Sequence, residues 1–271
     1  MVGKFRLGKK VPRNDPRTLR FARYAMALAA PPTQELWYKG VPSFGMDGND
    51  TYGDCTIAGA AHLMENWSYN ETPPSPVVLS TNDCVNDYLS LTGGADNGLD
   101  LLTVLQAWQG NGLVYGTSGS QSCLQKFFHC KVSGAGDDKI TAYAALKAGN
   151  QLEAQQAVWL FGGNYVGLEL PSFCVTGDML ATPWAVPPGG AVGVNAPNPA
   201  NGHCVAGVGY DSDNLYVVTW GTVKAMSWEF YQAYSDEGYA IISSDWLGSG
   251  TAPSGFDLVQ LQADLSAITS S

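Results

Sequence analysis

The sequence predicts an α+β fold of two lobes with a cleft between them, in which helices dominate the first lobe and antiparallel strands the second. The chain has 271 residues, enough to bury a core in one large domain or two small ones. Apolar residues recur at helical spacing early in the chain, whereas short runs rich in β-branched and aromatic residues, separated by turn residues, follow later. Because helices and strands are segregated, an alternating α/β sheet is disfavoured.

The composition is that of a folded, loop-rich chain. Hydrophobic residues make up 45% of the sequence and charged residues only 14%, which argues against a long disordered chain. No segment approaches the roughly 18 apolar residues of a transmembrane helix, and the alanine-rich segment 24–30 is too weakly apolar for a signal peptide. The six cysteines leave the redox compartment open, although Cys123 and Cys130 are spaced to close a short loop.

Charge is concentrated at the N-terminus. The chain carries a net charge of −10, yet its first 23 residues sum to +7 and the remainder to −17. The cations of this segment are Lys4, Arg6, Lys9, Lys10, Arg13, Arg17, Arg20 and Arg23. Such asymmetry predicts a basic arm, residues 1–30, that docks through residues 1–23 on an anionic partner or assembly. The candidates are nucleic acid, a membrane surface, an acidic protein or the acidic body of the chain itself, and a solvated tail is the alternative.

A helical lobe, residues 31–125, follows the arm. The stretch 45–53 is glycine-rich and indicates a surface loop. Residues 55–68 are expected to be helical because Ile57, Ala61 and Met64 share one face. Asp54 stands at the N-cap position, which places Cys55 in the first turn. A further helix is expected at 101–109, ended by the glycines of 110–112.

A β-rich lobe, residues 126–271, completes the chain. We expect two helices at its start, 142–148 and 152–161, and a strand at 165–170. Residues 204–210 and 215–220 should form a hairpin around the turn 211–214. A short helical segment at 227–234 and a last strand at 239–243 follow.

The residues that carry chemistry are a cysteine and a histidine far apart in sequence. A thiol is a strong nucleophile only as thiolate, and its pKa falls at a helix N-terminus and beside an imidazolium. Cys55 meets the first condition, and His203, at the mouth of a strand after the loop 187–202, can supply the second. His62 lies two helical turns beyond Cys55, roughly 10 Å away at about 1.5 Å per residue, so packing is its expected role. His129, between Phe128 and Cys130, is also expected to be structural.

Short motifs around these residues resemble the papain-like cysteine peptidases. The segment 49–56, Asn-Asp-Thr-Tyr-Gly-Asp-Cys-Thr, resembles the nucleophile loop of that family, with Asn49 where the family usually has an oxyanion-binding glutamine. Cys55 and His203 are 148 residues apart, within the span of about 130–150 typical of papain-like enzymes. Segments 98–114, 202–210, 217–221 and 237–241 resemble family elements in the same order, as in the uncharacterised bacterial and phage branch of the family.

Several positions depart from the family pattern. Val218 stands where the family has the asparagine that orients the histidine, and valine cannot hydrogen-bond an imidazole. Thr219, or a backbone carbonyl, is a candidate replacement, and Trp220 is expected to shield the histidine. Asp54 adds a charge that should raise the pKa of the thiol unless its side chain caps the helix. The roughly 30 residues before the mature-like region are too few for the inhibitory propeptide of the family.

The resemblance implies a cysteine hydrolase that cleaves peptide or amide bonds without a cofactor or metal. Cys55 would be the nucleophile and His203 the general base, while Asn49 and the backbone N–H of Cys55 would bind the oxyanion. Acyl transfer or deamidation could use the same dyad. The alternative is a weakly active or inactive papain-fold binding protein, anchored to an assembly such as a virus particle by its basic arm. A cytoplasmic or virion-associated location is favoured over secretion.

Overall fold

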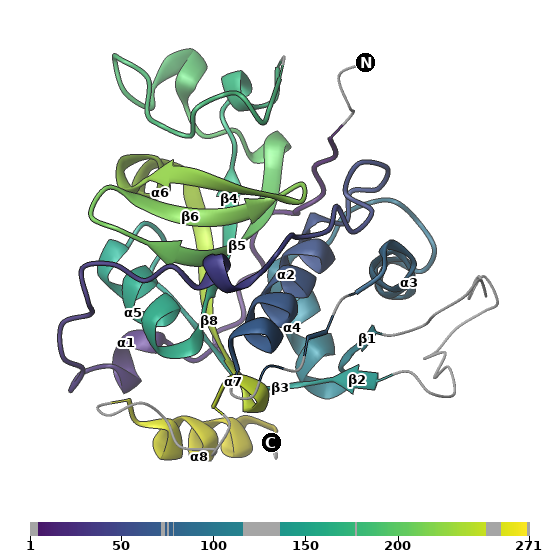
Figure 1. Cartoon of the computed structure of the whole chain (residues 1–271), viewed down its shortest axis with the longest axis vertical. Coiled ribbons are helices and arrows are strands. Elements are labelled where there is room, and N and C mark those ends of the chain that lie inside the picture. Colours follow the sequence, from purple (N-terminus) through teal and green to yellow (C-terminus); the bar gives the residue numbers. More distant parts are fainter. Residues whose placement is uncertain are drawn as a thin grey trace.

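The computed structural model of the chain describes residues 5–71, 74, 76–77, 79–115, 136–176, 178–247 and 256–269 (Figure 1). Its helices are α1 (Phe21–Tyr24), α2 (Cys55–Asn70), α3 (Thr81–Thr92), α4 (Leu101–Gly110), α5 (Gln151–Phe161), α6 (Trp228–Tyr234), α7 (Ser244–Leu247) and α8 (Leu258–Thr269). Its strands are β1 (Leu113–Tyr115), β2 (Gly136–Asp138), β3 (Ile140–Ala145), β4 (Asn164–Glu169), β5 (Gly202–Tyr210), β6 (Asn214–Thr219), β7 (Thr222–Ser227) and β8 (Ser235–Ser243).

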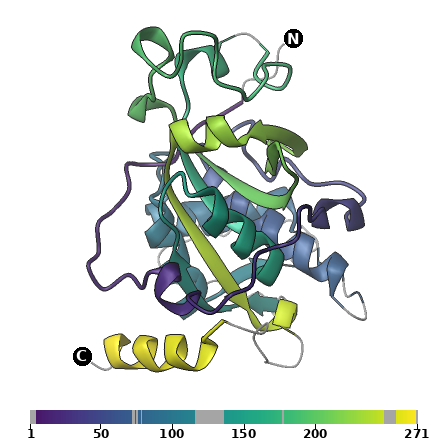
Figure 2. The ribbon, with the colours of Figure 1, turned by 90° about the vertical axis from the view of Figure 1, so that its left-hand side faces the viewer.

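One antiparallel sheet organises the later half of the chain. Its six strands are ordered β3-β8-β4-β5-β6-β7, and every neighbouring pair is antiparallel. A separate ribbon pairs β1 with β2. Helices α2 and α4 lie on one side of the sheet and α5 on the other (Figures 1 and 2). The fold is therefore α+β, as the sequence predicts.

Helix α2 is buried on almost all sides, which fixes its first residue in the centre of the molecule. Of its 16 residues, 14 are buried, because it packs against the sheet as well as against α3 and α4. Gly59 faces the sheet, where an added Cβ would lie 3.1 Å from the Tyr165 ring and 3.2 Å from the Cys204 sulfur. The absence of a side chain at Gly59 thus lets the helix approach β4 and β5 closely.

A tight hairpin turn ends β6 and begins β7. Trp220 and Gly221 form the two-residue connection between Thr219 and Thr222, which are cross-strand partners. Their φ angles are 46° and 68°, as a type I′ turn requires. Glycine adopts this conformation without strain, whereas Trp220 must be held in it by its contacts.

Most of the expected elements are confirmed, and one helix is wrong. The helices expected at 55–68, 101–109, 152–161 and 227–234, and the strands expected at 165–170, 204–210, 215–220 and 239–243, are present with small shifts at their ends. Residues 142–148 are not helical, because 140–145 form strand β3. The alanines there suggest a helix by propensity, but Ala142 and Ala144 pack in one core while Tyr143 and Ala145 pack in another. This alternation of faces is that of a strand.

Some elements were not predicted from the sequence, and one predicted boundary lies outside the described residues. The sequence reasoning missed α3, although Ser80 and Asp83 form a capping box at its start, and it missed β7 and α8. The expected lobe boundary at residue 125, together with Cys123, His129 and Cys130, lies outside the described residues. No helix in the described ranges is both long enough and apolar enough to span a membrane.

Ile57 tests how strongly the packing of α2 stabilises the fold. Its side chain is fully buried in the core that joins α2 to the sheet. Replacing it with alanine should lower the free energy of unfolding by about 2–5 kcal/mol, measured by urea denaturation. The matched control is Val194→Ala at an exposed site, which should change stability by less than about 0.5 kcal/mol. Similar effects for both variants would contradict the central position of α2.

Candidate active site

Cys55 is the first residue of α2, where the helix dipole favours a thiolate. Its side chain is only 1% exposed. The sulfur lies against the backbone N–H groups of Cys204 and Gly8, both of which lower the pKa of the thiol. Because Cys204 directly follows His203 on β5, the packing of α2 on the sheet brings the Cys55 sulfur next to the strand that carries this histidine.

His203 is held on two sides. Its Nε2 atom lies 2.8 Å from the Thr219 hydroxyl oxygen. Its ring stacks on the Trp220 ring at 4.4 Å between centroids, and the Trp184 ring lies edge-on at 6.4 Å. The Nδ1 atom is buried and has no hydrogen-bond partner among the described residues. The contacts with Thr219, Trp220 and Trp184 therefore fix the orientation of the imidazole.

The contacts of His203 explain the valine in the family asparagine position. Val218 pairs with Ala206 and packs in the core with α2, so its side chain belongs to the opposite face of β6. Thr219, one residue later, presents its hydroxyl to His203. The sequence reasoning named Thr219 and Trp220 as possible supports, and both contact the histidine.

Asn49 lies in the loop before Cys55 but its amide is directed within that loop. The side chain is 2% exposed, and its Nδ2 atom donates to the Tyr52 carbonyl at 3.1 Å. The amide also lies near the Asp54 carboxyl group, whose pKa it lowers. The Asn49 amide is thus engaged by Tyr52 and Asp54 within its own loop, and the oxyanion role expected for it requires that one of these contacts be released. The loop is not a surface loop throughout, because Asp47, Asn49 and Gly53 are buried.

Asp54 precedes the cysteine and is buried without capping the helix. It stands at the N-cap position, but its side chain makes no cap hydrogen bond. Burial, with a smaller contribution from the neighbouring Asp47 and Asp96, raises the pKa of this carboxyl to about 8. At neutral pH the group is mostly protonated. The negative charge beside the sulfur that the sequence suggests is therefore largely absent below about pH 8.

A segment of the N-terminal arm lies directly over this site, and we call residues 5–10 the covering segment. Its backbone bonds to three parts of the body. Arg6 N–H donates to the Asn49 carbonyl at 2.9 Å, and Lys9 N–H donates to the Gly202 carbonyl at 3.2 Å. On the other side, Leu99 N–H donates to the Gly8 carbonyl at 2.9 Å and the Leu99 carbonyl accepts from Lys10 at 2.9 Å. The covering segment therefore runs parallel to the chain at Leu99.

Glycines allow the covering segment to lie this close. An added methyl group on Gly8 would overlap the backbone of Gly53, next to Cys55. Methyl groups on Gly98 and Gly202 would overlap the backbone of the covering segment at Gly8 and Lys9, respectively. The contact is backbone against backbone on both sides.

Aromatic stacking continues the cover toward the histidine. The Phe5 ring stacks on Trp220 at 4.9 Å between centroids, and the Trp220 indole N–H donates to the Arg6 carbonyl at 3.2 Å. Trp220 is thus in contact with the covering segment as well as with His203.

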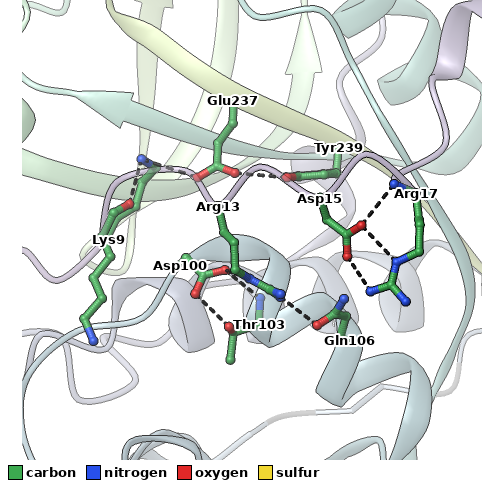
Figure 3. Close-up of polar contacts among 10 residues, drawn as sticks. Lys9, Arg13, Asp15, Arg17, Asp100, Thr103, Gln106, Glu237 and Tyr239 are labelled. Carbon is green, nitrogen blue, oxygen red and sulfur yellow. Dashed lines mark hydrogen bonds and ion pairs between the residues drawn. The ribbon is translucent and has the colours of Figure 1, made fainter.

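The cations of the arm pair largely with the chain's own acids (Figure 3). Lys9 Nζ lies 2.6 Å from Asp236 and 3.4 Å from Glu237. The other described pairs are Arg13 with Asp100 at 3.3 Å, Arg23 with Asp264 at 3.3 Å, and Arg17 with Asp15 at 2.8 Å. Lys9, Arg13 and Arg23 thus pair with acids of the chain's own body, whereas Arg17 pairs within the arm.

In this closed arrangement both reactive groups are neutral. Burial raises the pKa of the Cys55 thiol to about 11. Burial, together with the positive charges of His62 and Lys9, lowers the pKa of His203 to about 3. At neutral pH the pair is thiol and imidazole, and the charged forms that react with a carbonyl group are disfavoured.

His62 has the structural role expected for it. Its Nε2 atom lies 3.0 Å from Asp47 and 2.9 Å from the Gly45 carbonyl, and the His62 and Asp47 side chains are both buried. Burial opposes the charged imidazolium, but the pairing with Asp47 outweighs it and raises the pKa of His62. Cys84, Cys174 and Cys204 are free and buried, like Cys55. The described ranges contain no cluster of three or more His, Cys, Asp or Glu that could hold a metal ion.

Solved structures match this arrangement over most of the chain. Xylellain, a cysteine protease from Xylella fastidiosa, aligns with a TM-score of 0.62 at 15% identity, covering 90% of this chain and 98% of its own. The Carica candamarcensis cysteine protease CMS1MS2, solved in complex with E-64, aligns with a TM-score of 0.56 at 16% identity, covering 78% of this chain and 99% of its own. This chain has the papain-like fold. Procathepsin B S9 from Trypanosoma congolense aligns with a TM-score of 0.55 at 11% identity. The alignment covers 88% of this chain and 86% of the procathepsin chain. No family model and no curated relative matches the sequence.

Asp54 predicts a dependence of stability on pH. Its pKa is raised in the folded state, so folding binds a proton more tightly and stability falls as pH rises from about 4 to about 8. Asp54→Asn removes this dependence. Between pH 5 and pH 9, urea unfolding should show that the unmodified chain loses at least about 1 kcal/mol more stability than the variant. The control is Asp50→Asn at an exposed position in the same loop, and parallel pH profiles for all three proteins would contradict the burial of Asp54.

Proposed function

We propose that this protein is a cysteine hydrolase that cleaves peptide or amide bonds with Cys55 and His203. The observation that carries the proposal is the position of the Cys55 thiol, which lies on the opening turn of a buried helix and contacts the residue after His203. The orientation of His203 by Thr219 and Trp220 supports it. The papain-like fold, shared with known cysteine proteases, agrees with this chemistry.

The proposed reaction follows from these positions. His203 Nδ1 takes the thiol proton, and the Cys55 sulfur attacks the substrate carbonyl carbon to form a tetrahedral oxyanion. The backbone N–H of Cys55 and the Asn49 amide, once it is released from Tyr52 or Asp54, are the proposed oxyanion donors. The proton passes from His203 to the leaving amine, a thioester forms, and water hydrolyses it with His203 again acting as base. Cys55 and His203 end the cycle in their starting states.

We further propose that the structure represents a latent form. The covering segment occupies the space above Cys55 that a substrate needs, and it keeps both reactive groups buried and neutral. The Gly8 carbonyl accepts a hydrogen bond from the Leu99 N–H. This contact favours a segment that blocks the site over one that is cleaved by it. In this proposal the covering segment acts as an inhibitory segment, although the sequence analysis judged the residues before the mature-like region too few for the inhibitory propeptide of the family.

Gly8→Ala should unmask the thiol, because a methyl group at Gly8 overlaps Gly53 and displaces the covering segment. We expect iodoacetamide to label Cys55 at least about tenfold faster than in the unmodified chain, as a loss of about 1.4 kcal/mol in docking would produce. Peptide mapping by mass spectrometry identifies the labelled residue. The matched control is Gly110→Ala, where an added Cβ meets open space. Equal labelling of all three proteins would contradict latency.

Hydrolysis is tested with a fluorogenic peptide mixture on the Gly8→Ala protein. Adding Cys55→Ser should abolish turnover. Adding Thr219→Val should lower kcat more than KM and shift the pH profile, because His203 loses its orienting hydroxyl, while Thr219→Ser should restore both. A Thr219→Val protein with unchanged kcat and pH profile would contradict the positioning role of Thr219. If Cys55 is fully exposed and the protein still shows no turnover, the proposed hydrolase activity is wrong.

The second candidate is a weakly active or inactive papain-fold binding protein of the bacterial and phage branch, anchored to an assembly such as a virus particle through its arm. The engagement of the Asn49 amide within its own loop favours it. Its arm would have to exchange internal pairs, such as Lys9 with Asp236, for external ones. A salt-sensitive association with an anionic partner, lost when the arm cations are neutralised and unaffected by Cys55→Ser, would favour this candidate.

A further inference from the structure

The side chain of Lys9 enters a buried acidic pocket beside the candidate site. This side chain is 1% exposed, and its Nζ atom contacts Asp236 at 2.6 Å. Nζ also contacts Glu237 at 3.4 Å (Figure 3). It also donates to the Lys10 carbonyl at 3.1 Å. A Cβ on Gly167 of β4 would overlap the aliphatic part of the Lys9 side chain. Glycine at this position therefore provides the space that Lys9 occupies. We call the pocket formed by Gly167, Asp236 and Glu237 the acidic pocket.

The acidic pocket carries more negative charge than Lys9 neutralises. Two carboxylates face one ammonium group, and Glu169 at the end of β4 lies in the same electrostatic environment. The Tyr239 hydroxyl donates to Glu237 at 3.0 Å and holds that carboxylate in place. Burial raises the pKa of Glu237 to about 7, and Lys9 opposes this rise. Removing the cation leaves the buried Glu237 with only the Tyr239 hydroxyl as a partner and Asp236 without this ion pair, which is unfavourable.

The position of the acidic pocket connects it to the candidate site. The Lys9 backbone N–H bonds to Gly202, the residue before His203, and the preceding amide, that of Gly8, contacts the Cys55 sulfur. A peptide that replaces the covering segment meets the same hydrogen-bonding groups at Leu99 and Gly202. One of its side chains, close to the bond under attack, would then enter the acidic pocket.

We propose that the acidic pocket is a substrate subsite that selects peptides with a lysine or arginine side chain next to the cleaved region, and that Lys9 occupies it in the latent form. This inference rests on the proposed hydrolase function. Asp236 and Glu237 also line a neighbouring cavity of about 530 Å³ together with Pro12, Arg13 and Lys147. An arginine guanidinium can bond two carboxylates at once, so it fits the same pocket.

Substitutions of Lys9 in the full chain give the first test. Lys9→Met keeps most of the stem but removes the charge, so Cys55 should be labelled by iodoacetamide at least about tenfold faster, equivalent to about 1.4 kcal/mol. Lys9→Arg should label about as slowly as the unmodified chain. Equal labelling of Lys9→Met and the unmodified chain would overturn the subsite.

Added peptides give the second test, with the full-length Gly8→Ala, Lys9→Met protein as receptor. Peptides with the sequence of residues 5–13 carry Lys, Arg or Met at the position of Lys9, and protection of Cys55 from iodoacetamide measures their binding. The Lys and Arg peptides should protect at concentrations at least about tenfold lower than the Met peptide. A Met peptide with one extra terminal lysine, matched in net charge, should bind like the Met peptide. If it protects as well as the Lys peptide, attraction is nonspecific and the subsite is wrong.

The acidic pocket is tested from the protein side by Asp236→Asn with Glu237→Gln in the same receptor. This change should abolish the preference for Lys and Arg. If the changed protein does not fold, the peptide series decides alone, because it leaves the body unchanged. Cleavage is followed separately by mass spectrometry of model peptides. Selective protection without cleavage would leave the subsite standing and reject the hydrolase, whereas cleavage without a basic preference would do the reverse.

Discussion

The close packing of α2 on β4 and β5 is the constraint on which the rest of the molecule depends. Helix α2 is buried along nearly its whole length, and Gly59 lets it approach Tyr165 and Cys204 without a side chain between them. This approach brings the helix N-terminus against the strand that carries His203. The dipole of a buried helix end and the backbone amide of Cys204 both favour a thiolate at Cys55, and the Gly8 amide of the covering segment adds to this effect.

The covering segment opposes that preference by removing water. Burial is the largest cause of the raised pKa of Cys55 and of the lowered pKa of His203. The same contacts that block access therefore also hold the two groups in neutral forms. In the proposed latent form, steric cover and the neutral state of both groups follow from one event, the docking of residues 5–10, and both would be relieved together.

Much of this arrangement follows from local sequence patterns, and the remainder depends on contacts distant in sequence. The apolar spacing after Asp54 and the turn at 211–214 predict α2 and the β5–β6 hairpin, and with them Cys55 and His203 at element ends. The strand at 140–145 was not predicted because its alanines favour a helix. Its strand conformation depends on the packing of alternate residues in two separate cores. The path of the arm could not be predicted, since its charge fits any acidic surface. The glycines Gly8 and Gly202, which decide that path, meet only in the folded molecule.

The covalent connection between the covering segment and the body has a consequence for how strongly it must bind. A tethered peptide acts at an effective concentration of the order of millimolar, set by the length and stiffness of its linker and not by the amount of protein. In the proposed latent form, modest contacts therefore suffice to keep the covering segment docked over Cys55, and dilution does not release it. A free competitor must exceed that local concentration, so exchange favours ligands that bind the body much better, residue for residue, than the chain's own N-terminus.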